Sequence, residues 1–309
     1  MADENFSFSE VDNVYNSFLN PHLKNTLCWY ISGKCNLNCS FCEAKKSDHD
    51  SSKELEYLTK NWINFREGFQ NLQGRWEIFL LGGEPLSVPG ILDILRDLVR
   101  NGHKISLATN LSYSLGYYKK VLNILDGNLC LFLGTFKPEY YKPEPFLKKA
   151  QHIDYLVKRY GGVFGVGAVA EPDYLDYLYT LGFWFRERNI KFKLQKKRVN
   201  NVHINYNKDQ VCKIKEFGRR FSSIEDQKKI RFEETDLFKG RVCLTGINYF
   251  FMNSFGDCFR CHNLTHYKVN NENYLGNLPN GTLKLFKKPK TCPHSYCTCV
   301  LPKIKGLIL

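Results

Sequence analysis

The chain alternates between short apolar runs and amphipathic stretches, and this alternation limits its fold more than any other feature. Six apolar runs fit β-strands, and the stretches between them have helical periodicity. Strands in series that are separated by helices favour a parallel sheet with the helices outside it. The expected strands are 27–31, 76–81, 104–109, 129–135, 163–170 and 191–195, and the expected helices lie near 53–70, 89–101, 114–125, 145–159 and 172–188.

Such a sheet is either open or curled into a partial barrel, and in both cases ligands gather at the C-terminal ends of the strands. The charged segment 199–240 has no clear period and is expected to be a connector that is partly helical. From Cys243 onward the chain holds six of its twelve cysteines within 57 residues. A core that small is usually closed by metal, so we expect a first domain over 1–240 and a small Cys-rich module over 241–309.

The composition supports a folded protein with an anionic partner. Hydrophobic residues make up 43% and aromatic residues 15% of the 309 residues, which permits a large buried core. The chain has no run of eighteen apolar residues and a polar, acidic N-terminal stretch, so we expect a cytoplasmic protein without a membrane partner. The net charge of +13 favours phosphate, nucleic acid or an acidic peptide as partner, without choosing among them.

Three of the cysteines lie within the short stretch CNLNCSFC. Cys35, Cys39 and Cys42 directly follow the first expected strand. Twelve cysteines without an export signal indicate metal binding rather than disulfides. A zinc site usually takes four ligands in two pairs, whereas three thiolates on one loop can hold three irons of a [4Fe–4S] cluster and leave the fourth iron open. A zinc loop and three incidental thiols are the alternatives.

A second motif follows one β/α unit later, where the second expected strand ends in Leu-Leu-Gly-Gly-Glu-Pro at 80–85. The two motifs together resemble the radical S-adenosylmethionine (SAM) superfamily. Its signature is Cys-x3-Cys-x2-Cys with an aromatic residue before the last cysteine, here Phe41, and Gly-Gly-Glu-Pro after the second strand.

The resemblance implies a fold, a cofactor and a reaction. The fold would be a partial (β/α)6 TIM-like barrel of the α/β class, and the [4Fe–4S] cluster held by Cys35, Cys39 and Cys42 would generate the radical. SAM would bind the open iron and be cleaved to a 5′-deoxyadenosyl radical, which removes a hydrogen atom from a substrate. The electron would come from a reductant such as flavodoxin or ferredoxin.

The resemblance also assigns SAM contacts to the other strand ends. The peptide groups of Gly82 and Gly83 would bond the methionyl ammonium, with Glu84 supplying charge. Leu111 stands where the family often has glycine after Thr-Asn. Thr135 either points its hydroxyl toward the cofactor or is an ordinary β-branched strand residue. The residues expected to bind the cofactor are Phe41, Gly82, Gly83, Glu84, Pro85, Thr109, Asn110, Thr135, Val169 and Ala170.

The C-terminal cysteines resemble the twitch, or truncated SPASM, extension of radical SAM enzymes, because Cys243-x12-Gly256-x4-Cys261 has its spacing. The resemblance implies one auxiliary [4Fe–4S] cluster. Its ligands would be Cys243 and Cys261 with two of the last three cysteines. A zinc knuckle built from Cys258-x2-Cys261 and Cys297-x-Cys299 is the alternative. The last three cysteines are Cys292, Cys297 and Cys299, and the cysteines assigned to packing or chance are Cys28, Cys130 and Cys212.

Three function classes follow. The first is a radical SAM oxidase or maturase that acts on a peptide or small molecule, with net oxidation or bond formation aided by the auxiliary cluster. The second modifies a nucleotide or RNA, against which no RNA-binding module is recognisable. The third is a structural or redox-sensing iron–sulfur protein.

The last expected strand bears on the substrate. Its polar face, Lys191, Lys193 and Gln195, either points into the barrel toward an anionic group or lies on a solvated edge strand. Lys196-Lys197-Arg198 then reads as a solvated turn, or as a contact to phosphate or an acidic peptide.

Overall fold

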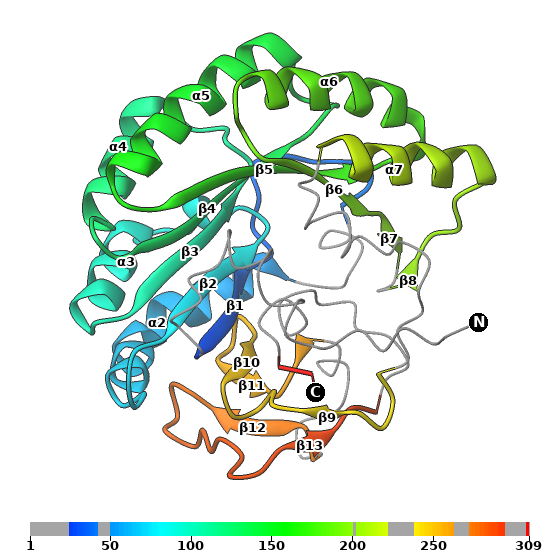
Figure 1. The fold of residues 1–309 in the computed structure, drawn as a ribbon. Helices are drawn as coiled ribbons and strands as arrows, with labels where there is room; N and C mark the ends of the chain where they lie inside the picture. Colours follow the sequence, from blue (N-terminus) through cyan, green and yellow to red (C-terminus); the bar gives the residue numbers. More distant parts are fainter. Residues whose placement is uncertain are drawn as a thin grey trace.

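A curved, mostly parallel sheet with helices on its outer side forms the protein (Figure 1). The computed structural model describes residues 25–42, 50–199, 202–221, 238–262, 272–293 and 307–308. Its first six strands pair in parallel in chain order. They are β1 (Thr26–Ser32), β2 (Glu77–Gly82), β3 (Lys104–Thr109), β4 (Leu129–Phe136), β5 (Val163–Ala170) and β6 (Phe192–Lys196).

Each crossover between these strands contains a helix, and Figure 1 shows the helices following one another around the outside of the arc. Side-chain caps begin two of them, because Asp50 accepts hydrogen bonds from the amides of Ser52 and Lys53, and Ser114 accepts one from Tyr117. The helices are α2 (Ser51–Gln70), α3 (Ile91–Arg100), α4 (Leu115–Ile124), α5 (Pro143–Arg159) and α6 (Leu175–Glu187), with short 3₁₀ turns at η3 (Pro85–Ser87) and η4 (Pro172–Tyr174).

The two faces of the sheet are both apolar, and alternate residues of each strand serve opposite faces. Trp29 of β1 packs outward, with its ring centroid 5.7 Å from that of Phe65 and 5.2 Å from that of Phe69 on α2. Cys28, one residue earlier, belongs to a separate cluster on the other face. We call this cluster the inner group, and it consists of Cys28, Phe79, Leu131, Tyr249, Phe251, Phe259 and Leu307.

The C-terminal strands extend the same sheet. β10 (Tyr249–Met252) pairs in parallel with β1, β11 (Asp257–Phe259) pairs antiparallel with β10, and β12 (Tyr274–Asn277) pairs antiparallel with β11. The sheet order is therefore β12-β11-β10-β1-β2-β3-β4-β5-β6. The boundary proposed near residue 240 thus does not interrupt the sheet. Two small antiparallel pairs stand apart, β9 (Val242–Cys243) with β13 (Lys290–Thr291), and β7 (Arg198–Val199) with β8 (Val202–His203).

Helix α2 covers the junction between β1 and these added strands. A Cβ built on Gly68 of α2 would lie 2.8 Å from the carbonyl oxygen of Leu278, so the helix backbone approaches the C-terminal segment closely. The rings of Tyr57 on α2 and Phe255 lie 5.3 Å apart in an edge contact. The C-terminal strands are therefore packed against the same helix as the barrel.

Most expected elements match the structure. Each of the six expected strands overlaps a strand, and the boundaries differ by one residue at most. The connector is partly helical, as predicted, because α7 (Lys208–Phe221) lies within it. β6 stands at the end of the sheet order, which agrees with the edge-strand alternative, and Phe192 is buried against Phe185 and Phe217.

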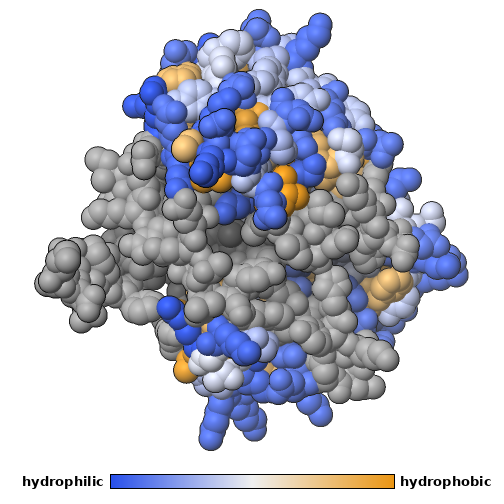
Figure 2. All heavy atoms as spheres, turned by 90° about the vertical axis from the view of Figure 1, so that its right-hand side faces the viewer, coloured by the Kyte–Doolittle hydropathy of each residue, from blue (hydrophilic) through white to orange (hydrophobic). Residues whose placement is uncertain are grey.

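No helix within the described ranges has both the length and the apolar character needed to cross a membrane. On the side of the molecule shown in Figure 2, the described surface is mainly hydrophilic, and hydrophobic residues are scattered rather than gathered in one large patch. Scattered apolar residues are normal on a protein surface and need no partner to cover them.

Candidate functional site

The candidate residues converge on one edge of the sheet. The cysteine loop follows β1, Gly82–Pro85 follow β2, and Thr109 and Asn110 close β3. Thr135 is the last residue but one of β4, and Ala170 ends β5. Because these strands are parallel, their C-terminal ends meet at the same edge, where α/β proteins bind ligands.

Within the cysteine loop, burial alternates along the chain. Cys35 and Cys39 are half-buried, whereas Lys34, Asn36 and Ser40 are exposed. Phe41 is 7% exposed, and Cys42, which is half-buried, donates its amide to the Cys39 carbonyl at 3.2 Å in a tight turn. The three thiols thus lie on the partly sheltered side of the loop, and the polar side chains face water.

The start of the loop is held by Glu54 in the first turn of α2. The Glu54 side chain is 1% exposed, and its Oε2 accepts hydrogen bonds from the Gly33 amide at 2.6 Å and the Ser32 hydroxyl at 3.2 Å. The Lys34 amide in turn donates to the Ser32 hydroxyl at 3.1 Å. A buried carboxylate that receives such bonds fixes the direction in which the chain leaves β1.

The paired glycines make a close approach to this same loop. The amides of Gly83 and Glu84 donate to the carbonyls of Ser32 and Lys34 at 2.9 and 2.8 Å. A Cβ on Gly83 would lie 2.4 Å from the carbonyl oxygens of Gly33 and Lys34. Gly82 has φ +145, and a Cβ there would lie 2.3 Å from the Ser32 oxygen. The N–H groups of Gly83 and Glu84 are therefore bonded to the cysteine loop. The carbonyl oxygens of the two glycines remain for the ligand contact expected from the sequence.

Glu84 plays a bracing role rather than offering an open charge. Its side chain is fully buried, Oε2 accepts from the Asn110 amide at 2.6 Å, and Oε1 accepts from the Leu86 amide at 3.1 Å. Burial raises the pKa of the Glu84 carboxyl above its usual value, although the hydrogen bonds from Asn110 and Thr109 oppose the shift. Glu84 thus joins the loop after β2 to the end of β3.

Asn110 connects the end of β3 with the cysteine loop. Its Nδ2 donates to Asn36 Oδ1 at 2.9 Å and lies 3.8 Å from the Cys35 sulfur. The next residue, Leu111, has φ 57 and is fully buried. This left-handed conformation costs a leucine about 1–2 kcal/mol, and it occurs where the resembled family often has glycine. Leu111 thus adopts the left-handed conformation that glycine reaches without this cost.

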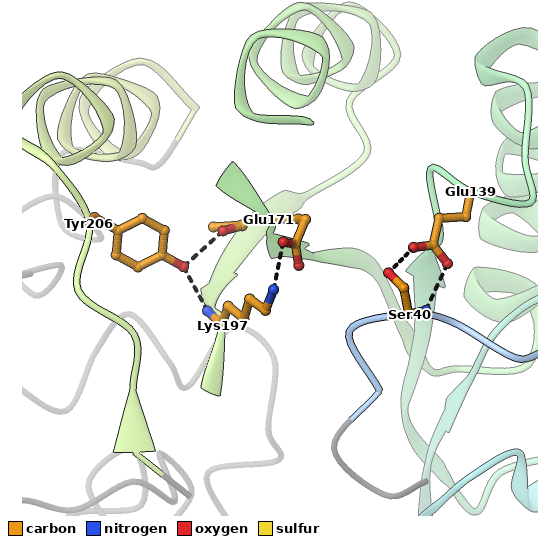
Figure 3. A network of polar contacts seen from close by, with 6 residues as sticks. Ser40, Glu139, Glu171, Lys197 and Tyr206 are labelled. Carbon is orange, nitrogen blue, oxygen red and sulfur yellow. Dashed lines mark hydrogen bonds and ion pairs between the residues drawn. The ribbon is translucent and has the colours of Figure 1, made fainter. Parts of the chain in front are cut away.

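The tip of the cysteine loop is fastened to the loop between β4 and α5 (Figure 3). The Ser40 amide donates to Glu139 Oε2 at 3.0 Å, and the Ser40 hydroxyl donates to Glu139 Oε1. The Asn38 amide donates to the Tyr140 hydroxyl at 2.8 Å. Two backbone amides from between the cysteines are therefore turned toward this second loop.

The charges around the thiols oppose one another. Burial is the main reason that the pKa of Cys39 is raised, while Lys137 lowers it and Glu139 raises it. The Lys137 ammonium also lies 5.6 Å from the centre of the Phe41 ring. The cysteine loop thus has one positive and one negative neighbour from the β4–α5 loop.

A tyrosine beside the loop carries an unsatisfied hydroxyl. Among the described residues, the buried Tyr141 hydroxyl has no hydrogen-bond partner. Burial raises the pKa of Tyr141, and the charges of Glu84, Cys39 and Cys35 raise it further, which places this side chain within electrostatic reach of them. A buried donor without a partner is what a bound ligand would satisfy.

The residues present fit an iron–sulfur cluster with an open iron. Three thiols share one side of a short loop, a fourth ligand from that loop is missing, and an orphaned hydroxyl lies nearby. Within the described ranges, no three His, Cys, Asp or Glu side chains are grouped so as to hold one metal ion. Ligands of a cluster bind different irons and need not converge on one point.

The remaining strand-end residues have partners within the protein. The Thr135 hydroxyl donates to the Thr109 carbonyl at 3.3 Å, so it carries a cross-strand bond. The Ala170 carbonyl accepts from the Tyr206 hydroxyl at 2.8 Å, and the Ala170 side chain is buried. Val169 is half-buried. These positions line the correct edge, and their contact with a cofactor remains a prediction.

Lys197 departs from the solvated turn expected for 196–198. Its ammonium lies 2.6 Å from Glu171 Oε1, and the two side chains are 20% and 10% exposed. Tyr206 also receives the Lys197 amide at 2.8 Å, so this network ties β6 to the end of β5 (Figure 3). A charge run in a sequence does not reveal such a pairing, because Glu171 comes from another strand end.

The described C-terminal cysteines lie in three different surroundings. Pairing of β9 with β13 sets Cys243 opposite Lys290, and the partly buried Cys292 packs against the cluster of Phe238, Cys243 and Ile308. Cys258 is fully buried in the large hydrophobic core that also contains Trp29 and Phe65, whereas Cys261 packs against the inner group. The knuckle that would use both Cys258 and Cys261 is therefore disfavoured. Cys297 and Cys299 lie outside the described residues.

The three cysteines assigned to packing or chance also differ. Cys28 is 1% exposed in the inner group, and Cys130 is 7% exposed. Burial of these two cysteines is the behaviour expected of a small apolar side chain. Cys212 is exposed on α7, so packing does not account for it.

No family model matches the sequence. The probable GTP 3′,8-cyclase of Methanocaldococcus jannaschii is 30% identical over 113 residues, which are 36% of this chain and 37% of that protein. The match therefore spans little more than a third of the relative's length.

Solved structures match over most of the chain. The structure of anSMEcpe with bound AdoMet, another name for SAM, has a TM-score of 0.56 at 17% identity and covers 92% of this chain and 82% of that one. Streptococcus suis SuiB bound to the precursor peptide SuiA has a TM-score of 0.52 at 16% identity and covers 92% and 73%. At 16–17% sequence identity, this structural similarity shows a shared fold and nothing more. The α/β partial barrel expected from the resemblance is thus confirmed.

Proposed function

We propose that this chain is a radical SAM enzyme that holds a [4Fe–4S] cluster on Cys35, Cys39 and Cys42 and cleaves SAM at the C-terminal edge of its barrel. The observation that carries the proposal is the placement of three half-buried thiols on one loop at that edge. The fold shared with anSMEcpe, whose structure contains bound AdoMet, supports it. When bound, the cluster would supply the electron that breaks the S–C5′ bond of SAM.

The chain's own residues would then position the ligands. Glu54 would hold the start of the cysteine loop, and Glu84 would hold the end of β3, because both side chains are buried and accept backbone amides. Tyr141 would hold its proton, since its raised pKa keeps the hydroxyl neutral, and would donate a hydrogen bond to the bound ligand. The buried aromatic and aliphatic inner group would keep water from the far side of the site.

The proposal is tested by anaerobic reconstitution followed by addition of SAM and a reductant. We expect 5′-deoxyadenosine from the wild-type protein and none from Cys39→Ala. Cys130→Ala is the matched control, because Cys130 is a buried strand cysteine outside the loop, and it should retain both cluster and activity. A cluster-containing wild-type protein that never forms 5′-deoxyadenosine would contradict the proposal.

We further propose that the C-terminal segment, which begins near residue 240 and continues the sheet of the barrel, holds an auxiliary [4Fe–4S] cluster. Cys243 and Cys292 are brought to neighbouring positions by β9 and β13, which supports their sharing a ligand set. Cys261, with Cys297 or Cys299, would complete it. Iron and sulfide analysis should give about eight of each per chain if both clusters form, and about four in the Cys243→Ala and Cys261→Ala variants.

For the substrate we propose a peptide or small molecule, oxidised or cross-linked overall. The fold shared with SuiB, which was solved with its precursor peptide SuiA, supports a peptide. The partial match to a probable GTP 3′,8-cyclase and the charge of +13 support a nucleotide as the second candidate. 5′-Deoxyadenosine formation should rise above the uncoupled background when the correct class of substrate is added, so peptide and nucleotide pools can be compared directly.

A further inference from the structure

The loop between β4 and α5 contacts the cysteine loop at more than one point, and none of its residues belongs to the cysteine or Gly-Gly-Glu-Pro motifs. Glu139 accepts both the amide and the hydroxyl of Ser40, and Tyr140 accepts the Asn38 amide. These partners are separated by 99 and 102 residues along the chain. Long-range bonds to a loop that has no strand or helix of its own determine where that loop sits.

The contacts fall between the expected iron ligands. Asn38 immediately precedes Cys39, and Ser40 immediately follows it. Both amides are turned outward to oxygen acceptors, at 2.8 and 3.0 Å. An amide that is committed to oxygen is not available to a cluster sulfur, and hydrogen bonds to the sulfurs are among the features that set a cluster's reduction potential.

The same loop brings two opposite charges to the site. Lys137 lies over the Phe41 ring, next to Cys42, and Glu139 lies against Ser40, next to Cys39. A nearby negative charge disfavours adding an electron to the cluster, and a nearby positive charge favours it. Removing the Glu139 charge should therefore raise the reduction potential, and removing the Lys137 charge should lower it.

We propose that Glu139 and Tyr140 hold the tip of the cysteine loop in its cluster-binding shape, and that Glu139, opposed by Lys137, sets the reduction potential of the cluster bound there. This inference rests on the proposed function, because it requires a cluster on Cys35, Cys39 and Cys42. Glu139, Tyr140 and Lys137 are positioning residues, because their contacts are with Ser40, Asn38 and Phe41 of the cysteine loop.

The test is a redox titration of the reconstituted protein, followed through the reduced-cluster EPR signal that Cys39→Ala abolishes. We expect Glu139→Gln to raise the midpoint potential, because the negative charge is gone while the glutamine oxygen can still accept the Ser40 amide. Lys137→Gln should lower it. The control variants are Glu144→Gln and Lys148→Gln. They remove one negative and one positive charge from exposed positions on α5 and should leave the potential unchanged.

Cluster retention tests the fastening separately from the charge. Tyr140→Phe removes the acceptor of the Asn38 amide without altering charge. It should therefore speed loss of iron to a chelator severalfold, and the freed amide should raise the potential by less than Glu139→Gln does. Glu139→Ala should both raise the potential and speed the loss. Tyr155→Phe, at an exposed tyrosine of α5, should do neither.

The outcomes separate the two proposals. A wild-type protein that binds no cluster on the three cysteines contradicts the proposed function itself. A wild-type protein that binds the cluster, together with Glu139→Gln and Lys137→Gln variants that leave its potential unchanged or shift it in the same direction, contradicts this inference alone.

Discussion

Gly83 determines how closely the loop after β2 approaches the cysteine loop. Both of its nearest contacts are backbone oxygens, at 2.4 Å from a Cβ, and backbone cannot give way as a flexible side chain can. The glycine is therefore required by the protein's own packing, whatever ligand binds beside it.

Substituting Gly83→Ala should displace the cysteine loop. We expect a loss of stability of about 1–3 kcal/mol from overpacking, together with a clear loss of bound iron after reconstitution. Gly116→Ala is the matched control. Its Cβ would meet only the Ser114 hydroxyl, at 3.9 Å, on the exposed face of α4, so it should be neutral or slightly stabilising. Normal iron content in Gly83→Ala would show that the close approach is dispensable.

His103 provides a pH dependence that is separate from the site, because it precedes β3 at the opposite edge of the sheet. It is 1% exposed, and its Nε2 lies 3.1 Å from the Phe69 carbonyl oxygen. Burial lowers the pKa of His103 below the usual 6.5, although the bond to Phe69 opposes the shift. The folded protein therefore binds this proton less readily than the unfolded chain does.

The free energy of unfolding should consequently fall as the pH drops below about 6.5, and its His103 contribution should be complete above that value. His103→Gln keeps a donor toward Phe69 but cannot titrate. Urea unfolding between pH 5.5 and 7.5 should show a shallower pH dependence in this variant than in the wild type. His152→Gln, at an exposed histidine of α5, should leave the slope unchanged. Equal slopes in all three proteins would contradict the assignment to His103.

Sequence reasoning can propose the candidate residues that stand in a motif, but not the residues that brace them. The cysteines and Gly82–Pro85 have fixed spacing, so one sequence reveals them. Glu54, Glu139 and Tyr140 act by accepting backbone amides from a distant part of the chain. Any exposed-looking acid or tyrosine could serve in that way, and no spacing rule marks which one does.

At the scale of elements, α2 packs on the outer side of β1 through aromatic contacts. Phe65 is fully buried and contacts Trp29, Trp62 and Tyr57 through its ring. These contacts join α2 to β1, whose end carries the cysteine loop.

Phe65→Ala should lower the free energy of unfolding by about 3–5 kcal/mol, because it removes a large buried ring and leaves a cavity. Ile63→Ala, on the same helix but 48% exposed, should cost under about 0.5 kcal/mol. Urea unfolding followed by tryptophan fluorescence measures both. Similar costs for the two variants would mean that α2 is not packed as described.

The parallel strands could be predicted because each is an apolar run bounded by polar turns, and their order follows the chain. β10 was missed. Tyr249–Met252 is also an apolar run, but it lies in a segment whose cysteines, glycines and asparagines drew attention to metal binding. Its partner β1 is more than two hundred residues away, and periodicity within a strand says nothing about which strand it pairs with.

At the scale of the whole molecule, β10 removes a free edge from β1. The pairs Thr26 with Tyr249 and Cys28 with Phe251 join the start of the described chain to its C-terminal segment, and Phe251 enters the inner group. The two segments should therefore unfold together, since an apolar strand edge without its partner is unstable in water.

Hydrogen exchange at increasing urea concentration tests whether β1 and the C-terminal strands unfold together. We expect the amides of β1, β2 and β10 to exchange through one common opening event. The short β7–β8 pair provides an internal control, because its two-residue strands should exchange earlier. An opening of β10–β12 at much lower free energy than β1 would instead show an independent C-terminal unit.

The measurement that tests the central claim most directly is EPR spectroscopy of the anaerobically reconstituted, reduced protein with and without SAM. The proposed function predicts a [4Fe–4S] signal that depends on Cys35, Cys39 and Cys42 and whose shape changes when SAM binds the open iron. Zinc in place of iron on these cysteines, or a cluster signal that is indifferent to SAM, would contradict it.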